Sequence, residues 1–287
     1  MNGNPRIDGA DERWEAYRRD LTAYVMTDAE PGEAVLVVGA GACDDLELEW
    51  LLENDRQVFL LDCNPEALQA GTEKVGKHEN LHTICADAVE LSEQQLDAFQ
   101  KACEAGTETL SEWQTVYEDT FRTQRSFRHV VQETLELYGI PKFDRIICMG
   151  FHSQVYMPLI LTLQTGRYPL SVRQQVQRIV EHLNRSFAEE SLCVMRQYGR
   201  VVYLGYEYTT FLREDTALRE EAIERLTEQG SSGLHQMRMS RVEGAYQLEQ
   251  EIGKAYEKQE LQIADCAYML WPFSEEKSYL MVIFRIL

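Results

Sequence analysis

This sequence lacks a long apolar run. No stretch approaches the ~18–20 apolar residues needed to cross a bilayer. Residues 1–11 are polar and do not contain the apolar segment of a secretion signal. We therefore expect a cytoplasmic protein with no membrane as a partner.

Basic residues are also scarce relative to acidic ones. Lys and Arg total 28 against 48 Asp and Glu, which gives a formal charge of −20. Such a surface repels phosphate backbones and anionic headgroups, so nucleic acid is not an expected partner. A neutral or cationic small substrate, or a basic peptide segment, fits this charge better. The alternative is that the acidity only aids solubility.

The seven cysteines include no C-x-x-C pair, which argues against a zinc ribbon or a thioredoxin-like motif. We expect reduced thiols and no metal site. Four of them fall near the ends of predicted strands: Cys43, Cys63, Cys85 and Cys148. They would then lie near one another, either as a metal or redox site or as small side chains filling tight space. The second interpretation is favoured.

Short apolar runs alternate with helical patterns over most of the chain. Expected strands are Ala34–Val38, Gln57–Leu61, Leu81–Cys85, Phe143–Met149 and Arg200–Gly205. Expected helices are Asp44–Asn54, Pro65–Lys77 and Ser171–Gln197. Continuous apolar strands between helices are typical of a parallel sheet buried on both faces.

The last two apolar runs, Leu261–Leu270 and Lys277–Leu287, are joined by a connector too short for a parallel crossover. The predicted fold is therefore α/β: a Rossmann-like, mostly parallel, seven-stranded sheet with a C-terminal antiparallel hairpin. We expect one domain over residues 1–287. It would carry a leading helix within 1–30, at Ala10–Thr27, and helical insertions at 91–141 and 207–260.

The second insertion contains a probable loop at Gly230–Gly233. Both insertions are long enough to cover an active site or, alternatively, to form a homodimer.

A glycine-containing turn, Gly39-Ala40-Gly41, follows the first predicted strand. Glycines there allow a sharp turn and close approach to a ligand. Asp62 ends the next strand, a little over 20 residues on, where a carboxylate can accept hydrogen bonds from both ribose hydroxyls. Together these features indicate a cofactor that contains adenosine.

The residues after the turn bear on which cofactor this is. A dinucleotide places its pyrophosphate on the N-terminus of the following helix. Asp44 is a good N-cap for that helix, and Glu47 completes the spacing of a capping box. The Asp44 carboxylate would oppose a pyrophosphate, whereas a cofactor with a positive sulfonium would not meet that conflict.

These residues resemble the class I S-adenosylmethionine-dependent methyltransferases, whose first-strand motif is hh-[D/E]-h-G-x-G-x-G. Gly39 and Gly41 match the first two glycines, Asp62 matches the ribose-binding acid, and Asp87 matches the residue that meets the adenine amino group. The chain departs from the motif twice. Cys43 replaces the third glycine, and Val37 replaces the acid that helps to order the loop and the methionine amino group.

The resemblance covers residues 34–287 and implies S-adenosyl-L-methionine as the cofactor. The cofactor-binding residues would be Gly39, Ala40, Gly41, Asp62, Cys63, Asp87, Ala88 and Met149. The implied activity is methyl transfer to a small-molecule or peptidic nucleophile. Two alternatives stay open: a non-catalytic nucleoside-binding or regulatory protein that retains the fold, and a nucleotide-dependent oxidoreductase.

His152 and Tyr156 follow the fourth predicted strand and are the candidate catalytic acid–base residues; the alternative for His152 is packing or capping. An aromatic surface for a cationic amine is a second hypothesis, with ordinary packing as its alternative. Its residues would be Tyr206, Tyr208, Trp271 and Phe273. Glu207 would either pair with that amine or be solvated.

Overall fold

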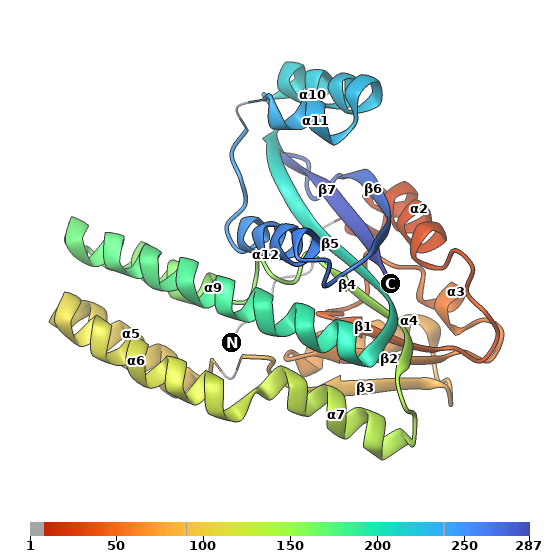
Figure 1. Ribbon diagram of the computed structural model, residues 1–287, viewed down its shortest axis with the longest axis horizontal. Coiled ribbons are helices and arrows are strands. Elements are labelled where there is room, and N and C mark those ends of the chain that lie inside the picture. The colour runs from red at the N-terminus through yellow and green to blue at the C-terminus, as the bar shows by residue number, and fades with distance from the viewer. Residues whose placement is uncertain (1–8, 90, 238) are drawn as a thin grey trace.

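A seven-stranded sheet of order β3-β2-β1-β4-β5-β7-β6 runs through the centre of the computed structural model (Figure 1). The structure describes residues 9–89, 91–237 and 239–287. The strands are β1 Ala34–Val38, β2 Gln57–Asp62, β3 Leu81–Cys85, β4 Phe143–Met149, β5 Gly199–Leu212, β6 Ile263–Trp271 and β7 Lys277–Ile286.

Strands β1 to β5 pair in parallel, and β7 lies antiparallel between β5 and β6. The predicted fold class is confirmed. All five residues of β1 are buried, as its unbroken Ala-Val-Leu-Val-Val sequence predicts. Because β2 lies on one side of β1 and β4 on the other, the chain reverses its winding direction here. In such sheets a crevice opens beyond the carboxyl ends of these two strands.

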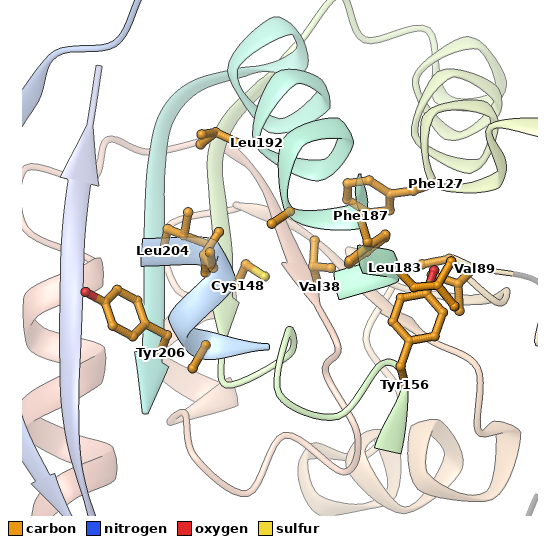
Figure 2. Close-up of a cluster of buried hydrophobic side chains, with 14 of the residues drawn as sticks. Val38, Val89, Phe127, Cys148, Tyr156, Leu183, Phe187, Leu192, Leu204 and Tyr206 are labelled. Atoms are coloured by element: carbon orange, nitrogen blue, oxygen red, sulfur yellow. The ribbon is translucent and has the colours of Figure 1, made fainter. Parts of the chain in front are cut away.

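Helices cover both faces of the sheet. One face packs against α2 (Glu15–Val25), α3 (Leu48–Leu52) and α4 (Pro65–Val75), and a short α1 (Ala10–Arg13) precedes α2. The other face packs against α9 (Leu170–Tyr198). Figure 2 shows Leu183, Phe187 and Leu192 of α9 close to Val38, Cys148 and Leu204 of the sheet, all within one buried cluster.

The remaining helices lie on the α9 side or beyond it. Within residues 91–141 the chain forms α5 (Glu93–Ala105), α6 (Thr107–Gln124) and α7 (Ser126–Tyr138). These helices run alongside α9 (Figure 1), where Phe121 and Phe127 approach Phe187. Further along the chain are α8 (Met157–Thr165), α10 (Thr216–Gln229), α11 (Ser231–His235) and α12 (Ala245–Glu257). Across the described ranges, no helix is both long and apolar enough to cross a membrane.

Several predicted boundaries are wrong. Strand β5 continues to Leu212, so the first residues of the predicted insertion 207–260 belong to the sheet. The reason is tertiary: β7 pairs with β5 as far as Leu212↔Lys277, with a bulge after Glu207. Of the predicted loop Gly230–Gly233, only Gly230 lies outside a helix, and the other three residues begin the short helix α11.

At the start of the chain, the predicted helix Ala10–Thr27 is divided into α1 and α2 at Trp14. Residues 1–8 of the predicted 1–30 segment lie outside the described residues.

Arg145 of β4 makes a buried ion pair and hydrogen bonds that connect β4 with three other parts of the chain. Its Nε lies 3.1 Å from Glu33 Oε2, and Nη1 donates to the Val25 carbonyl at 2.8 Å and to the Tyr203 hydroxyl at 3.0 Å. The guanidinium thus connects the end of α2 and the approach to β1 with β4 and β5. A buried charge of this kind is costly to leave without its partner.

We expect Arg145→Met to lower the free energy of unfolding by about 3–5 kcal/mol, because Glu33 and the Val25 carbonyl lose their shared partner. The matched control is Arg200→Met, which removes an exposed arginine that is 3.3 Å from Asp144 and should cost less than about 1 kcal/mol. Urea denaturation of both variants measures the difference. Equal losses would show that Arg145 contributes no more than a surface pair.

Candidate functional site

The turn after β1 has three left-handed residues. Gly39, Gly41 and Cys43 have φ of 67°, 52° and 52°. The left-handed region costs a residue with a side chain about 1–2 kcal/mol. Cys43 therefore adopts the conformation that suits the third glycine of the motif, and its buried thiol packs beside the sheet. This departure from the methyltransferase motif preserves a backbone conformation that suits glycine.

Asp62, at the end of β2, organises this turn. Its Oδ2 accepts the Gly41 N–H at 2.8 Å, and its Oδ1 accepts the Asn64 N–H at 2.8 Å. A carboxylate has about four lone-pair positions, so acceptor sites remain for two ribose hydroxyls. Val37, which stands where the motif has an acid, is buried in the sheet. In this chain Asp62 orders the glycine turn.

The other residues expected to bind the cofactor follow the neighbouring strands. Asp87 Oδ1 accepts the Val89 N–H at 3.0 Å just beyond β3, and Ala88 beside it is buried. Cys63 is exposed after β2, and Met149 ends β4 with its sulfur over Gly205. The eight residues thus share the carboxyl edge of β1 to β4, and their roles in binding stay predictions.

The prediction that Asp44 caps a helix with Glu47 is wrong. Helix α3 begins only at Leu48, and Glu47 precedes it with no side-chain capping bond. Asp44 pairs with Lys74 of α4. Arg18 of α2 holds Glu47, with its Nε 2.9 Å from Glu47 Oε1. Contacts from α2 and α4 have therefore replaced the first turn of the predicted helix.

The segment after the glycine turn still disfavours a dinucleotide, but for a different physical reason. Because Asp44 is paired with a lysine, its charge no longer argues strongly against a pyrophosphate. However, a dinucleotide loop requires a helix N-terminus directly at the turn. Here an irregular segment separates Gly41 from the short α3. The oxidoreductase alternative therefore lacks the element that would hold its cofactor.

Two carboxylates with raised pKa lie near this edge. Burial, assisted by the neighbouring Asp44 carboxylate, raises the pKa of Asp45 to about 6. Burial raises the pKa of Glu207 to about 7, opposed by the hydrogen bond from Ser153 and by Lys277. Glu207 is only 2% exposed, which contradicts the solvated alternative. Sequence reasoning missed the burial of Glu207, for which the apolar and aromatic residues around it in β5 were the only signal.

The candidate acid–base residues are buried on the α9 side. His152 Nε2 forms a hydrogen bond of 2.8 Å with Ser191 of α9, its ring approaches Phe187, and burial lowers its pKa to about 3. Tyr156 is 1% exposed and lies beside Tyr117; burial raises its pKa (Figure 2). A neutral, enclosed imidazole suits packing, so the structure favours the packing alternative over an acid–base role.

The expected single aromatic surface is divided between two faces of the sheet. Tyr206 and Tyr208 are buried on the α9 side, and the Arg241 guanidinium lies 3.9 Å from the Tyr208 ring centre. Trp271 and Phe273 lie on the α2 side. The prediction of a single aromatic surface is wrong because successive side chains of a strand point to opposite faces of the sheet, and these four residues do not all point to the same face.

On the α2 side the aromatics form a cluster. Trp271 stacks on Tyr17 at 5.7 Å and meets Trp14 edge-on at 5.0 Å, and Trp14 Nε1 donates to the Phe273 carbonyl at 3.1 Å. Helix α2 is thereby fixed to the β6–β7 hairpin beside the carboxyl edge of the sheet.

The four cysteines near strand ends also fail to form one cluster. Cys43 and Cys148 are buried on opposite faces, while Cys63 and Cys85 are exposed. All seven cysteines are free thiols. Among residues 9–89, 91–237 and 239–287, no group of three His, Cys, Asp or Glu side chains is arranged to hold a metal ion.

No family model matches the chain, and no curated protein matches it. Solved structures with a similar fold include magnesium protoporphyrin IX methyltransferase from Synechocystis PCC 6803 with bound SAH. It is 13% identical with a TM-score of 0.43, over 98% of this chain and 89% of that one. N-methyltransferase NodS from Bradyrhizobium japonicum WM9 is 11% identical with a TM-score of 0.44, over 97% of each chain.

Aeropyrum pernix fibrillarin with bound S-adenosyl-L-methionine is 13% identical with a TM-score of 0.40, over 94% of this chain and 76% of that one. Because all three TM-scores lie below 0.5, the function of this chain has to be inferred from its own residues.

We expect Gly39→Ala to destabilise the protein by about 2–4 kcal/mol. The new Cβ would lie 2.6 Å from Phe151 Cδ2, and the residue would keep a φ of 67°. Gly32→Ala is the matched control, since Gly32 has a φ of 77° with nothing within 4 Å of the new Cβ. Its cost should be near 1 kcal/mol. Urea denaturation that gives the same loss for both would show that Phe151 does not restrict the turn.

We expect Glu207→Gln to raise the free energy of unfolding at pH 8 by about 1–3 kcal/mol. Burial raises the pKa of this carboxyl in the folded state, so its contribution to stability is full below about pH 4.5 and is lost as the pH rises through about 7. The gain should therefore vanish near pH 4. Thermal melts across this range test it, with the exposed Glu275→Gln as control. A gain that does not vary with pH would contradict the assignment.

Proposed function

We propose that this chain binds S-adenosyl-L-methionine and transfers its methyl group to a small-molecule or peptidic nucleophile. The observation that carries the proposal is the Asp62 carboxylate, which accepts the Gly41 N–H at the switch point between β1 and β4. It lies where ligands bind in open parallel sheets, with lone pairs left for ribose hydroxyls.

Three further features support this cofactor over other nucleotides. A Cβ at Gly41 would meet nothing within 4 Å, so the turn leaves room for close approach of a ligand. The irregular segment after it offers no helix N-terminus for a pyrophosphate. The half-buried Asp45 and the buried Glu207 suit a cofactor that carries positive charge.

Methyl transfer is an in-line displacement at carbon, and the bound cofactor supplies the activated methyl group. The chain contributes alignment and exclusion of water. Asp62 and the glycine turn would fix the nucleoside. Helix α2 and the hairpin would close one side, held by Trp14, Tyr17, Trp271 and Phe273. With His152 neutral and enclosed, an acceptor that needs no strong base fits best.

A nucleoside-binding regulatory protein with this fold is the second candidate. The burial of His152 and Tyr156 favours it, because both residues expected to perform acid–base chemistry are packed against the α9 side. Turnover of a labelled methyl group across an acceptor panel of amines, thiols and basic peptides distinguishes the two functions.

We expect wild-type protein to bind S-adenosylhomocysteine but not NAD in titration calorimetry. Asp62→Asn should weaken S-adenosylhomocysteine about 10–100-fold, since hydrogen bonds to a charged group contribute about 1.5–3 kcal/mol. Asp55→Asn, an exposed site just before β2 and at its opposite end, is the control and should bind normally. Tight NAD binding, or full affinity in Asp62→Asn, would overturn the proposed function.

A further inference from the structure

The Glu207 carboxylate is buried with only one of its oxygens satisfied. Oε1 accepts the Ser153 hydroxyl at 2.9 Å, while Oε2 is enclosed and has no hydrogen-bond partner within the described parts of the chain. Burying a carboxylate without pairing it is costly. Lys277, the nearby cation, lies 4.5 Å from the ring centre of Phe273 and 4.8 Å from that of Tyr279. Among the described residues, no hydrogen bond or ion pair therefore offsets the burial of charge at Oε2, and a bound positive group would.

Glu207 lies at the switch point. Its Oε1 is 3.0 Å from the Cβ position of Gly150, the residue that follows β4. Since Val38 pairs with Cys148, Gly150 is the counterpart of Ala40 in the glycine turn. Along the edge, Asp62 of β2, the turn after β1, Gly150 after β4 and Glu207 of β5 follow one another on adjacent strands. Neighbouring strands lie about 4.8 Å apart, so the backbones of β2 and β5 are about 14 Å apart.

Aromatic side chains lie on the same face of the sheet, since Glu207 pairs with Met281, which is buried in the cluster that contains Tyr17. Burial raises the pKa of Tyr17, and the Asp45 and Glu207 carboxylates add to that rise. Trp271 stacks on Tyr17, and its indole N–H is buried without an acceptor among the residues that the structure describes. Aromatic faces beside a desolvated carboxylate attract organic cations and exclude water.

We infer that Glu207 binds a positively charged group at the sulfur end of the cofactor, either the sulfonium or the α-ammonium. This inference rests on the proposed function. If Asp62 holds the ribose, a cofactor that runs along this edge would bring its sulfur and then its amino acid past the glycine turn toward Gly150 and Glu207. Glu207 then supplies a carboxylate that Val37 cannot.

Three ligands separate the possible contacts. S-adenosylmethionine has both cations, S-adenosylhomocysteine has only the ammonium, and 5′-methylthioadenosine has neither. We expect Glu207→Gln to bind 5′-methylthioadenosine like wild type in calorimetry at pH 8. If the ammonium is the partner, the variant's affinities for S-adenosylhomocysteine and S-adenosylmethionine should both be at least tenfold lower than those of wild type. If the sulfonium is the partner, only S-adenosylmethionine is affected.

Glu275→Gln, an exposed acid of the hairpin, is the matched control and should bind all three ligands normally. Unchanged affinities in Glu207→Gln, an equal change for all three ligands, or tighter binding would overturn the inference while leaving the proposed function intact. If wild-type protein binds none of the three, the proposed function fails and this inference fails with it.

A pH series gives a second readout. The titratable and charged groups that interact with Glu207 are Tyr17, Cys148 and Lys277, and the Ser153 hydroxyl donates a hydrogen bond to it; Asp45 also acts on Tyr17. Since burial raises the pKa of Glu207 to about 7, wild-type affinity for the affected ligand should rise between pH 6 and 8. The Glu207→Gln variant still contains Asp45. Any part of the increase in affinity with pH that is present in wild type and absent from the variant is therefore due to Glu207. Identical pH profiles in both proteins would contradict the inference.

Discussion

Two backbone N–H groups share one carboxylate at the carboxyl edge of this sheet, and the candidate site depends on that sharing. Asp62 accepts from Gly41 in the turn after β1 and from Asn64 at the start of α4. Because β1 and β2 are buried and in fixed register, the carboxylate cannot move away from the turn. A single side chain thereby fixes the glycine turn and presents its remaining lone pairs toward the crevice.

The segment after the turn depends on the neighbouring helices. Arg18 of α2 and Lys74 of α4 hold Glu47 and Asp44, and Lys74 also donates to the Ala42 carbonyl at 2.8 Å. These contacts leave α3 with only five residues, Leu48–Leu52. The loss of a long helix here removes the dipole that a pyrophosphate would use. Local contacts between charged side chains have thus narrowed the choice of ligand.

Burial separates the acidic residues into two groups with different consequences. Most of the 48 acidic side chains add to a surface charge that repels other anions. Asp45 is half-buried and Glu207 is fully buried, and burial raises the pKa of each. Burying the Glu207 carboxylate costs free energy in the free protein, and a bound cation would offset that cost. The stability of the free protein and its affinity for a cation are therefore linked through this one carboxyl group.

The sheet, its parallel and antiparallel parts, and the edge where Gly39, Gly41, Asp62 and Asp87 gather could be predicted from the amino-acid sequence. These features follow from apolar runs, glycines and connector lengths, which act over a few residues. Three side-chain arrangements could not be predicted in this way: Asp44 pairs with Lys74, His152 packs against α9, and Glu207 is enclosed. Each of these outcomes depends on side chains brought together from distant parts of the chain, and no local pattern records which face or partner a side chain will meet.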